Sequence, residues 1–418
     1  MLLARLARHL NRIRKSFPRR LALKTAHPKR IHPKFNLKEE QEYPPMRLSS
    51  TLAAAVLSSA AFSTPALADD PLKVGYIYVG PVEDLGWTFR HDVGRLAVEA
   101  AYGDAVEVTY IENVPEGPGA VDALTDLAET GHDIIFATSF GFMDAVNEVA
   151  AQYPDVAFEH ATGYIRESDN VATFSARFYE GRVVQGLMAA KLTETNKIGY
   201  IASFPIPEVY RGINAFMFEA QKHNPEIEVE IIWNFSWFDP VKEAAAANTL
   251  IDNGADILVM HVDSPAGMQI AEARGVRAFG QASDMSRFGP NAHLFSIVDD
   301  WDSYYIDTVG QVMSGTWEGG ADADTWWGLT KDSMGGDQGM VRLASYNDNL
   351  PADLLAEAKA LEAALANGDR HSFPCEGLIK ADGTKPEECV SGADHLVDWP
   401  TMLTMDWYIQ GIDALPPQ

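Results

Sequence analysis

The chain has two cysteines, far fewer basic than acidic residues and, after residue 68, no segment that approaches 18 consecutive apolar residues. The lack of a long apolar run argues against a membrane-spanning helix in that part of the chain. With 33 Lys and Arg against 59 Asp and Glu, the formal net charge is −26. A surface this acidic repels nucleic acid and anionic lipid, so neither is an expected partner.

The sequence also lacks the short motifs that mark common enzymes. It has no G-x-S-x-G, no G-x-x-x-x-G-K-[ST], no G-x-G-x-x-G after the first predicted strand and no H-E-x-x-H. Its 11 histidines are scattered without the spacing of metal ligands. We therefore expect a protein that is not an enzyme and that uses no metal and no cofactor. A secreted hydrolase, with catalytic residues assembled only in space, is the less favoured alternative.

Residues 46–68 are predicted to be a secretory signal peptide. Arg47 precedes an apolar Ala/Leu/Val run, and the small-residue sequence Ala66-Leu67-Ala68 precedes Asp69. We expect cleavage near Ala68 and a mature, soluble protein in the periplasm. Residues 1–45 contain twelve Lys/Arg and are predicted to be either a non-native start or an extended basic leader. Residues 69–418 alone carry 20 basic and 56 acidic residues, a formal charge of −36.

The two cysteines, Cys375 and Cys389, lie near the C-terminus. In an oxidising compartment they are predicted to form one disulfide that closes a short loop. A metal site would need more Cys or His at short spacing, and only His371 and His395 are nearby. Neither cysteine follows the predicted cleavage site directly, which argues against a lipid-anchored N-terminus.

From residue 74 onward, short apolar runs alternate with amphipathic segments. Strands separated by single helices predict parallel βαβ units with right-handed crossovers. The alternation restarts near residue 176, so two similar α/β lobes are expected. The predicted strands are 74–79, 106–111, 133–137, 156–159, 171–174, 197–202, 227–233, 257–260, 277–280, 294–298, 326–329 and 341–344. The predicted helices are 87–102, 120–130, 142–152, 179–193, 211–223, 240–253, 266–274, 301–315 and 351–366, and residues 371–418 are expected to form an irregular tail.

Aromatic, polar and acidic residues follow the carboxyl ends of many of these strands. That edge of an open parallel sheet is where ligands bind. Large aromatic side chains there can stack on a planar ligand while a few polar groups orient it. The candidate ligand-binding residues are Trp87, Asp84, Ser139, Phe140, Trp237, Asp263, Asp284 and Arg211.

Several of these candidates have a purely structural alternative. Trp87 and Trp237 both stand at helix starts, where either could be a hydrophobic staple. Asp84 and Asp284 could cap the helix or turn that follows them. Arg211 could simply pair with a neighbouring acid.

The order of several short phrases resembles the basic-membrane-protein (BMP) type of ABC-transporter substrate-binding proteins, which includes purine-nucleoside receptors. The resemblance extends over residues 69–418. The matching phrases are Glu83-Asp84-Leu85-Gly86-Trp87, Phe142-Met143-Asp144-Ala145-Val146, Tyr153-Pro154-Asp155-Val156, Glu180-Gly181, Ala189-Ala190-Lys191, Lys197-Ile198-Gly199-Tyr200, Trp237-Phe238-Asp239-Pro240 and Gly254-Ala255-Asp256-Ile257.

The resemblance implies the type I periplasmic binding protein fold, with two Rossmann-like lobes of parallel sheets joined by a three-strand hinge. The implied N-terminal lobe is 69–175 plus about 297–330, and the C-terminal lobe is 176–296 plus about 331–418. It further implies a monomer that delivers its ligand to a membrane permease. In this family, aromatic residues at the positions of Trp87 and Trp237 sandwich a purine ring, and an acid at Asp284 reads its polar groups.

Three positions depart from the family pattern. Trp87 replaces the more usual Phe, and His261-Val262-Asp263-Ser264-Pro265 replaces a Gly-rich turn. Where nucleoside receptors carry a Lys after the 294–298 strand, this chain has Asp299-Asp300. Because that Lys serves ribose recognition, a free purine base is expected at least as much as a nucleoside. A sugar or polyol receptor of the same fold stays the main alternative.

Overall fold

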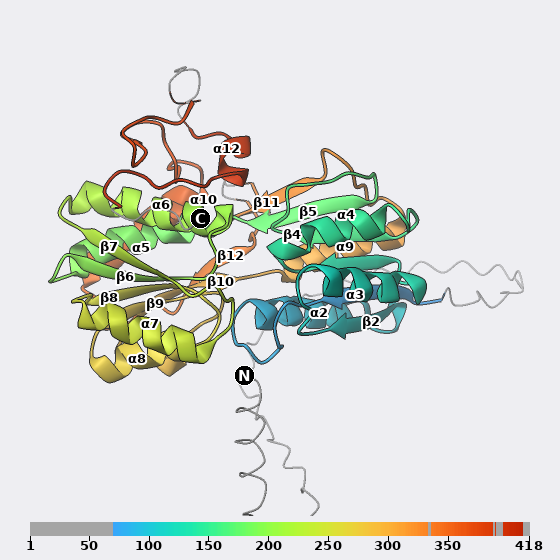
Figure 1. Ribbon diagram of the computed structural model, residues 1–418, viewed down its shortest axis with the longest axis horizontal. Helices are drawn as coiled ribbons and strands as arrows, with labels where there is room; N and C mark the ends of the chain where they lie inside the picture. The colour runs from blue at the N-terminus through green and yellow to red at the C-terminus, as the bar shows by residue number, and fades with distance from the viewer. Residues whose placement is uncertain (1–69, 333–335, 388, 390–395, 413–418) are drawn as a thin grey trace, which may run out of the picture. The chain divides into compact units, whose positions relative to one another are not determined.

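The computed structural model describes residues 70–412, except 333–335, 388 and 390–395. The predicted signal peptide and leader lie outside the described residues. The described chain forms two six-stranded sheets (Figure 1). We call the first sheet, with the helices packed on it, the N-terminal lobe, and the second the C-terminal lobe. Both are α/β units of the predicted class.

The sheet of the N-terminal lobe has the strand order β11-β5-β4-β3-β1-β2, and all of its pairs are parallel. The sheet of the C-terminal lobe has the order β12-β10-β9-β8-β6-β7 and is parallel except for the pair β10–β12. The strands of the first sheet are β1 (Leu72–Ile77), β2 (Val106–Ile111), β3 (Ile134–Ala137), β4 (Ala157–Ala161), β5 (Val171–Ala176) and β11 (Asp324–Trp327). Those of the second are β6 (Lys197–Ala202), β7 (Glu228–Trp233), β8 (Ile257–His261), β9 (Arg277–Gly280), β10 (His293–Asp299) and β12 (Val341–Ala344).

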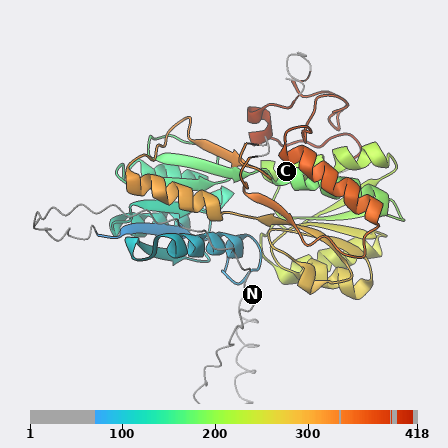
Figure 2. The same cartoon turned by 180° about the vertical axis from the view of Figure 1, so that it is seen from behind.

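Helices cover both faces of each sheet (Figures 1 and 2). In β1, Tyr76 joins one buried cluster and its neighbour Ile77 joins another, because successive strand residues point to opposite faces. Burial on both faces explains the continuous apolar runs of the sequence. The N-terminal lobe carries α2 (Trp87–Tyr102), α9 (Asp302–Ser314), α3 (Pro118–Glu129) and α4 (Met143–Ala150). The C-terminal lobe carries α5 (Phe178–Leu192), α6 (Pro207–His223), α7 (Pro240–Asp252), α8 (Ala266–Arg274) and α10 (Ala352–Ala366).

The described chain passes between the two sheets three times. It leaves the first sheet after β5, returns to it after β10 and leaves again between β11 and β12. Such crossings permit one lobe to rotate against the other, as in hinge-closing binding proteins.

Most predicted elements match the structure within two or three residues, and one helix differs by four. Helix α6 begins at Pro207 rather than 211, because proline is well suited to the first helical position. The strand predicted at 326–329 is Asp324–Trp327, two residues earlier, and it pairs in parallel with β5. The tail, expected to be irregular, also contains a short helix, α12 (Trp399–Leu403).

The tail after α10 packs against both lobes. On α6, Arg211 donates to the Met402 carbonyl at 2.6 Å and Asn214 donates to the Trp407 carbonyl at 2.8 Å. Toward the N-terminal lobe, the Trp399 and Trp326 rings have centroids 3.9 Å apart. Cys375 and Cys389 are joined in the predicted disulfide. None of the helices in the described part of the chain is long and apolar enough to span a membrane.

Candidate ligand-binding site

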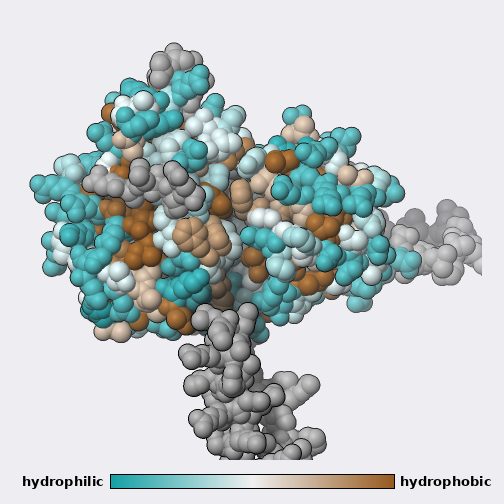
Figure 3. Space-filling view, in the orientation of Figure 1, coloured by the Kyte–Doolittle hydropathy of each residue, from teal (hydrophilic) through white to brown (hydrophobic). Residues whose placement is uncertain are grey.

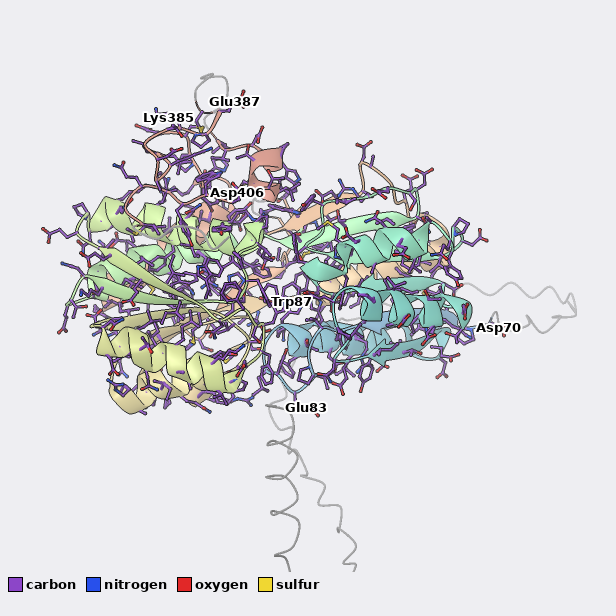
Figure 4. The ribbon with its side chains drawn as sticks, viewed as in Figure 1. Asp70, Glu83, Trp87, Lys385, Glu387 and Asp406 are labelled. Atoms are coloured by element: carbon purple, nitrogen blue, oxygen red, sulfur yellow. A yellow bond between two sulfur atoms is a disulfide. The ribbon has the colours of Figure 1, made fainter. Side chains whose placement is uncertain are left out.

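A pocket of about 390 Å³, including its part open to solvent, lies between the carboxyl ends of strands from both lobes. We call it the interlobe pocket. Figure 4 shows Trp87 at the boundary between the lobes, and Figure 3 shows apolar patches of the C-terminal lobe beside that boundary. The N-terminal lobe supplies Val79, Trp87, Ser139, Phe140 and Thr162. The C-terminal lobe supplies Ile206, Glu208, Trp237, His261, Asp263 and Gln281.

Asp84 fixes the start of the helix that carries Trp87. Its Oδ1 accepts the backbone N–H groups of Gly86 and Phe89 at 2.8 and 3.0 Å, and its Oδ2 accepts that of Thr88 at 3.0 Å. Asp84 is only 1% exposed, and this burial raises the pKa of its carboxyl group to about 6. It does not line the interlobe pocket. Asp84 therefore takes the capping role named as its alternative.

The indole of Trp87 is held in one orientation by its own lobe and by α5. Its Nε1–H donates to the Thr138 carbonyl at 2.7 Å. His91, Trp301 and Phe178 meet the ring edge to face, with centroids 4.4, 5.4 and 6.2 Å away. A ring fixed in this way loses little conformational entropy when a flat ligand stacks on it.

Trp237 lies across the pocket, in the loop between β7 and α7. Phe204 packs against its ring at a centroid distance of 5.2 Å. Its carbonyl accepts the backbone N–H of Asp263 at 3.0 Å, which ties two strand-end loops of the C-terminal lobe together. Its indole Nε1 is buried and has no hydrogen-bond partner in the described part of the chain. A buried donor without a partner is costly unless a ligand or water supplies one.

Asp263 links the two lobes. Its Oδ1 accepts the backbone N–H of Trp87 at 3.2 Å, although 176 positions separate the two residues. The Asp263 side chain is buried, and burial together with the nearby Asp84 and Glu243 carboxyl groups raises its pKa well above the usual value. The protonated form of Asp263, which needs no counter-ion, is therefore favoured.

Glu208 and His261 form a buried pair on the C-terminal side of the pocket. Glu208 lies in the first turn of α6, His261 ends β8, and Glu208 Oε1 is 3.2 Å from His261 Nε2. Burial lowers the pKa of His261, so the imidazole stays neutral, with its one proton on Nε2 toward the carboxylate. Glu208 Oε2 and His261 Nδ1 are both buried without a partner among the described residues. Two acceptors are thus left for another molecule.

Ser139 and Phe140, which follow β3, line the N-terminal side of the pocket. The Ser139 hydroxyl donates to Glu116 Oε1 at 2.7 Å, and the Phe140 ring lies 6.1 Å from that of Tyr164. On the other side, the Arg182 guanidinium donates to the side-chain oxygen Oε1 of Gln281, which follows β9, and holds that side chain in place. The described residues contain no cluster of His, Cys, Asp and Glu that could hold a metal ion.

Comparisons with known proteins identify the family of this chain. Residues 72–359 match the family of PnrA-like ABC transporter substrate-binding proteins, named Bmp. The chain belongs to this family. It is 44% identical over 369 residues to a purine-binding protein of Brucella abortus (strain 2308), covering 88% of this chain and 99% of the relative.

Two further similarities bear on fold and ligand. The chain is 36% identical over 300 residues to a Haloferax volcanii protein named as an ABC transporter glucose-binding protein, covering 72% of this chain and 73% of that one. An ABC solute-binding protein of Aeropyrum pernix K1 superposes with a TM-score of 0.61 at 19% identity, covering 76% of this chain and 94% of the other. The resemblance to the family and the predicted fold class are thus confirmed. The family is one of ABC transporter substrate-binding proteins.

Of the residues predicted for this substrate-binding protein, the structure brings five together in the interlobe pocket. They are Trp87, Ser139, Phe140, Trp237 and Asp263.

Asp284 lies outside the pocket. It is exposed, its Oδ1 accepts the Ser286 N–H at 2.9 Å, and its Oδ2 accepts the Ser345 hydroxyl. It lines a separate cavity with Arg90 and Arg287. The oxygens of Asp284 therefore cap a turn and accept from Ser345, the residue that follows β12, and they do not line the interlobe pocket.

Arg211 also lies outside the pocket. Its guanidinium, 4.7 Å from the centre of the Trp326 ring, donates to the Met402 carbonyl of the tail. Helix α6 begins at Pro207, so its first turn places Glu208 at the pocket and Arg211 under the tail. The structure thus places Arg211 at the tail and not in the interlobe pocket.

Six lining residues were not predicted: Val79, Thr162, Ile206, Glu208, His261 and Gln281. The strand-end pattern alone could have selected His261 and Gln281, since each ends or directly follows a strand. Glu208 could be placed at the pocket only when the start of α6 at Pro207 was known. Thr162 has a left-handed backbone, with φ of 62°, which no feature of the sequence signals.

Proposed function

We propose that this ABC substrate-binding protein captures a planar purine base, or a purine nucleoside, in the interlobe pocket and delivers it to its permease. The observation that carries the proposal is the presence of two indole side chains, Trp87 and Trp237, in one pocket and on opposite lobes. Aromatic rings on both sides of a cleft suit a flat ligand, because stacking buries both of its faces.

The lining of the pocket supports an uncharged ligand. None of the described residues that line it is a Lys or Arg, and Asp263 and His261 are both driven toward their neutral forms by burial. At the end of β10, where nucleoside receptors carry a Lys, Asp299 is fully buried and Asp300 pairs with Arg342 at 3.5 Å. These features favour a free base over a nucleoside whose ribose would need that Lys.

A sugar is the second candidate ligand. Aromatic rings also stack on sugar faces, and one relative is named for glucose binding at 36% identity. The relative named for purine binding is more similar, at 44% identity over nearly its whole length. The purine proposal is therefore preferred.

Ligand capture would proceed by closure of the lobes. The ligand stacks on one lobe, the three crossings between the sheets permit rotation, and contacts such as Trp87 N–H to Asp263 form across the cleft. Closure removes water from the ligand's polar edges, which strengthens its hydrogen bonds. The closed form would then dock on the permease.

Titration calorimetry with adenine, guanine, hypoxanthine, their nucleosides and glucose tests this proposal. Trp87→Ala should weaken binding of the preferred purine by about 1–3 kcal/mol, the range for base–aromatic stacking. Trp407→Ala, which removes an indole of the tail that contacts Lys380, is the matched control and should leave affinity unchanged. Glucose binding without purine binding, or an unchanged dissociation constant in Trp87→Ala, contradicts the proposal.

We also propose that the protein acts in the periplasm after removal of residues 46–68 with any preceding leader. The support is the small-residue sequence Ala66-Leu67-Ala68 before the acidic start of the mature chain. Intact-mass analysis of the exported protein should give an N-terminus near Asp69. A retained leader in the exported protein would contradict this.

A further inference from the structure

We infer that the interlobe pocket selects purines that carry an exocyclic amino group over their oxo counterparts, through Glu208 and His261 as hydrogen-bond acceptors and Trp237 as donor. This inference rests on the proposed function and narrows its ligand class. It follows from which buried polar atoms of the pocket-lining residues are left without partners among the described residues.

The acceptors come from one buried pair. Carboxylate oxygens accept only, so the contact between Glu208 Oε1 and His261 Nε2, 3.2 Å long, places the imidazole proton on Nε2. That leaves the lone pair of His261 Nδ1 free, together with Glu208 Oε2, and neither atom has a partner among the described residues. Both residues are at least 92% buried, since their exposed fractions are 8% and 5%.

The donor comes from the stacking aromatic itself. Trp237 Nε1–H, the third unpartnered atom, belongs to another residue that lines the same pocket. An indole nitrogen can only donate, so the ligand must present an acceptor to it. The lobe that carries α6 and β8 thus offers two acceptors and one donor to whatever occupies the pocket.

An exocyclic amino group beside an unprotonated ring nitrogen complements this set. The two amino hydrogens can be donated to Glu208 and His261, while the ring nitrogen accepts from Trp237. An oxo group at the same position would place an oxygen lone pair against a carboxylate and an imidazole lone pair. Sites built to pair a buried polar group discriminate strongly against an analogue that leaves it unpaired.

The test uses two pairs of bases, adenine with hypoxanthine and guanine with xanthine. In each pair the first base carries an amino group where the second carries an oxo group. Each base is titrated into the mature protein by calorimetry. In at least one pair we expect the amino member to bind at least about tenfold more tightly. Oxo members that bind as tightly as, or more tightly than, their amino partners in both pairs overturn the inference while leaving the proposed function intact. Binding of glucose and of no purine overturns both.

Glu208→Gln separates recognition from folding. The amide oxygen can still accept from His261 Nε2–H, and the NH₂ group then replaces the free Oε2 acceptor with a donor. We expect the amino-over-oxo preference to fall at least about tenfold or to reverse. Glu226→Gln, which removes the same charge from an exposed position after α6, should keep the preference of the wild type. A correctly folded Glu208→Gln protein, judged by its circular dichroism and melting temperature, with an unchanged preference overturns the assignment.

Discussion

Gly86→Ala should force the two lobes apart at the contact between Gly86 and Asp263. A Cβ atom added at Gly86 would lie 2.5 Å from Asp263 Cβ and 2.6 Å from Asp263 Cα, both in the opposite lobe. Non-bonded carbon atoms are at their optimum about 3.5–4.0 Å apart, so the two loops must separate by about 1 Å. The obstructing atoms include backbone, which cannot rotate away as the end of a long side chain could.

The size of the effect follows from this overlap. Overpacking a well-packed contact costs about 1–3 kcal/mol, and here the cost falls only on the closed form. Because the proposed capture of the ligand requires closure, affinity should drop about 5–150-fold. The ligand-free protein can avoid the clash by opening, so its melting temperature should change little. Calorimetry and thermal denaturation measure the two quantities.

Gly80→Ala is the matched control in the same loop. Its added Cβ would meet Thr88 Oγ1 at 3.1 Å and Asp84 Oδ2 at 3.5 Å, both in its own lobe. It should therefore leave affinity within a few-fold of wild type. Equal losses of affinity in both variants, or no loss in Gly86→Ala, would refute the reasoning that this contact forms on closure.

Two further measurements test buried charge and the tail. Burial raises the pKa of Asp84 to about 6, so its favourable contribution is complete at acid pH and is lost as pH rises through 6. Relative to Asp84→Asn, which can still cap α2, the wild type should lose on the order of 3 kcal/mol of stability between pH 4 and pH 7 in urea titrations. A constant difference would contradict this. Reduction of the Cys375–Cys389 disulfide, which spans 14 positions, should cost the tail about 3 kcal/mol. Reductant should lower the melting temperature of the wild type and leave that of the double Cys→Ser variant unchanged. The expectation would be contradicted if the two proteins melted at the same temperature both with and without reductant.

Most of the fold could be predicted because its signals are local. Strands such as Val106–Ile111 and Arg277–Gly280 are short segments between helical ones, and the structure has them at the predicted bounds. The pairing of β11 with β5 could not be predicted, because it joins residues about 150 positions apart. β11 also contacts the tail, where Trp399 Nε1–H donates to Asp324, and α9, where the Tyr304 ring meets that of Trp327. The short helix α12 was missed for a related reason, since it is stabilised by contacts with α6 and β11 rather than by its own five residues.

The site was predictable only in part. Trp87 and Trp237 were predicted to line a site because all parallel strands of a sheet end at the same edge, so residues that follow any of these strands lie at that edge. Asp84, Asp284 and Arg211 were selected because they too are polar residues near strand ends. Their polar atoms are already bound within the protein: Asp84 accepts backbone N–H groups, Asp284 accepts a hydroxyl and Arg211 donates to a carbonyl of the tail. Which polar atoms remain free for a ligand depends on the hydrogen bonds that the folded chain forms around them, and the order of residues along the sequence does not show these bonds.

The amino-acid sequence alone determined the two-lobed α/β architecture, the family resemblance and the aromatic character of the site, because periodicity and strand-end composition are properties of contiguous residues. Only the tertiary structure decided that Glu208, His261 and Trp237 leave unpartnered atoms in one pocket, and that Gly86 lies against Asp263. Those facts arise where segments far apart in the chain meet, so they depend on how the lobes pack rather than on any local pattern.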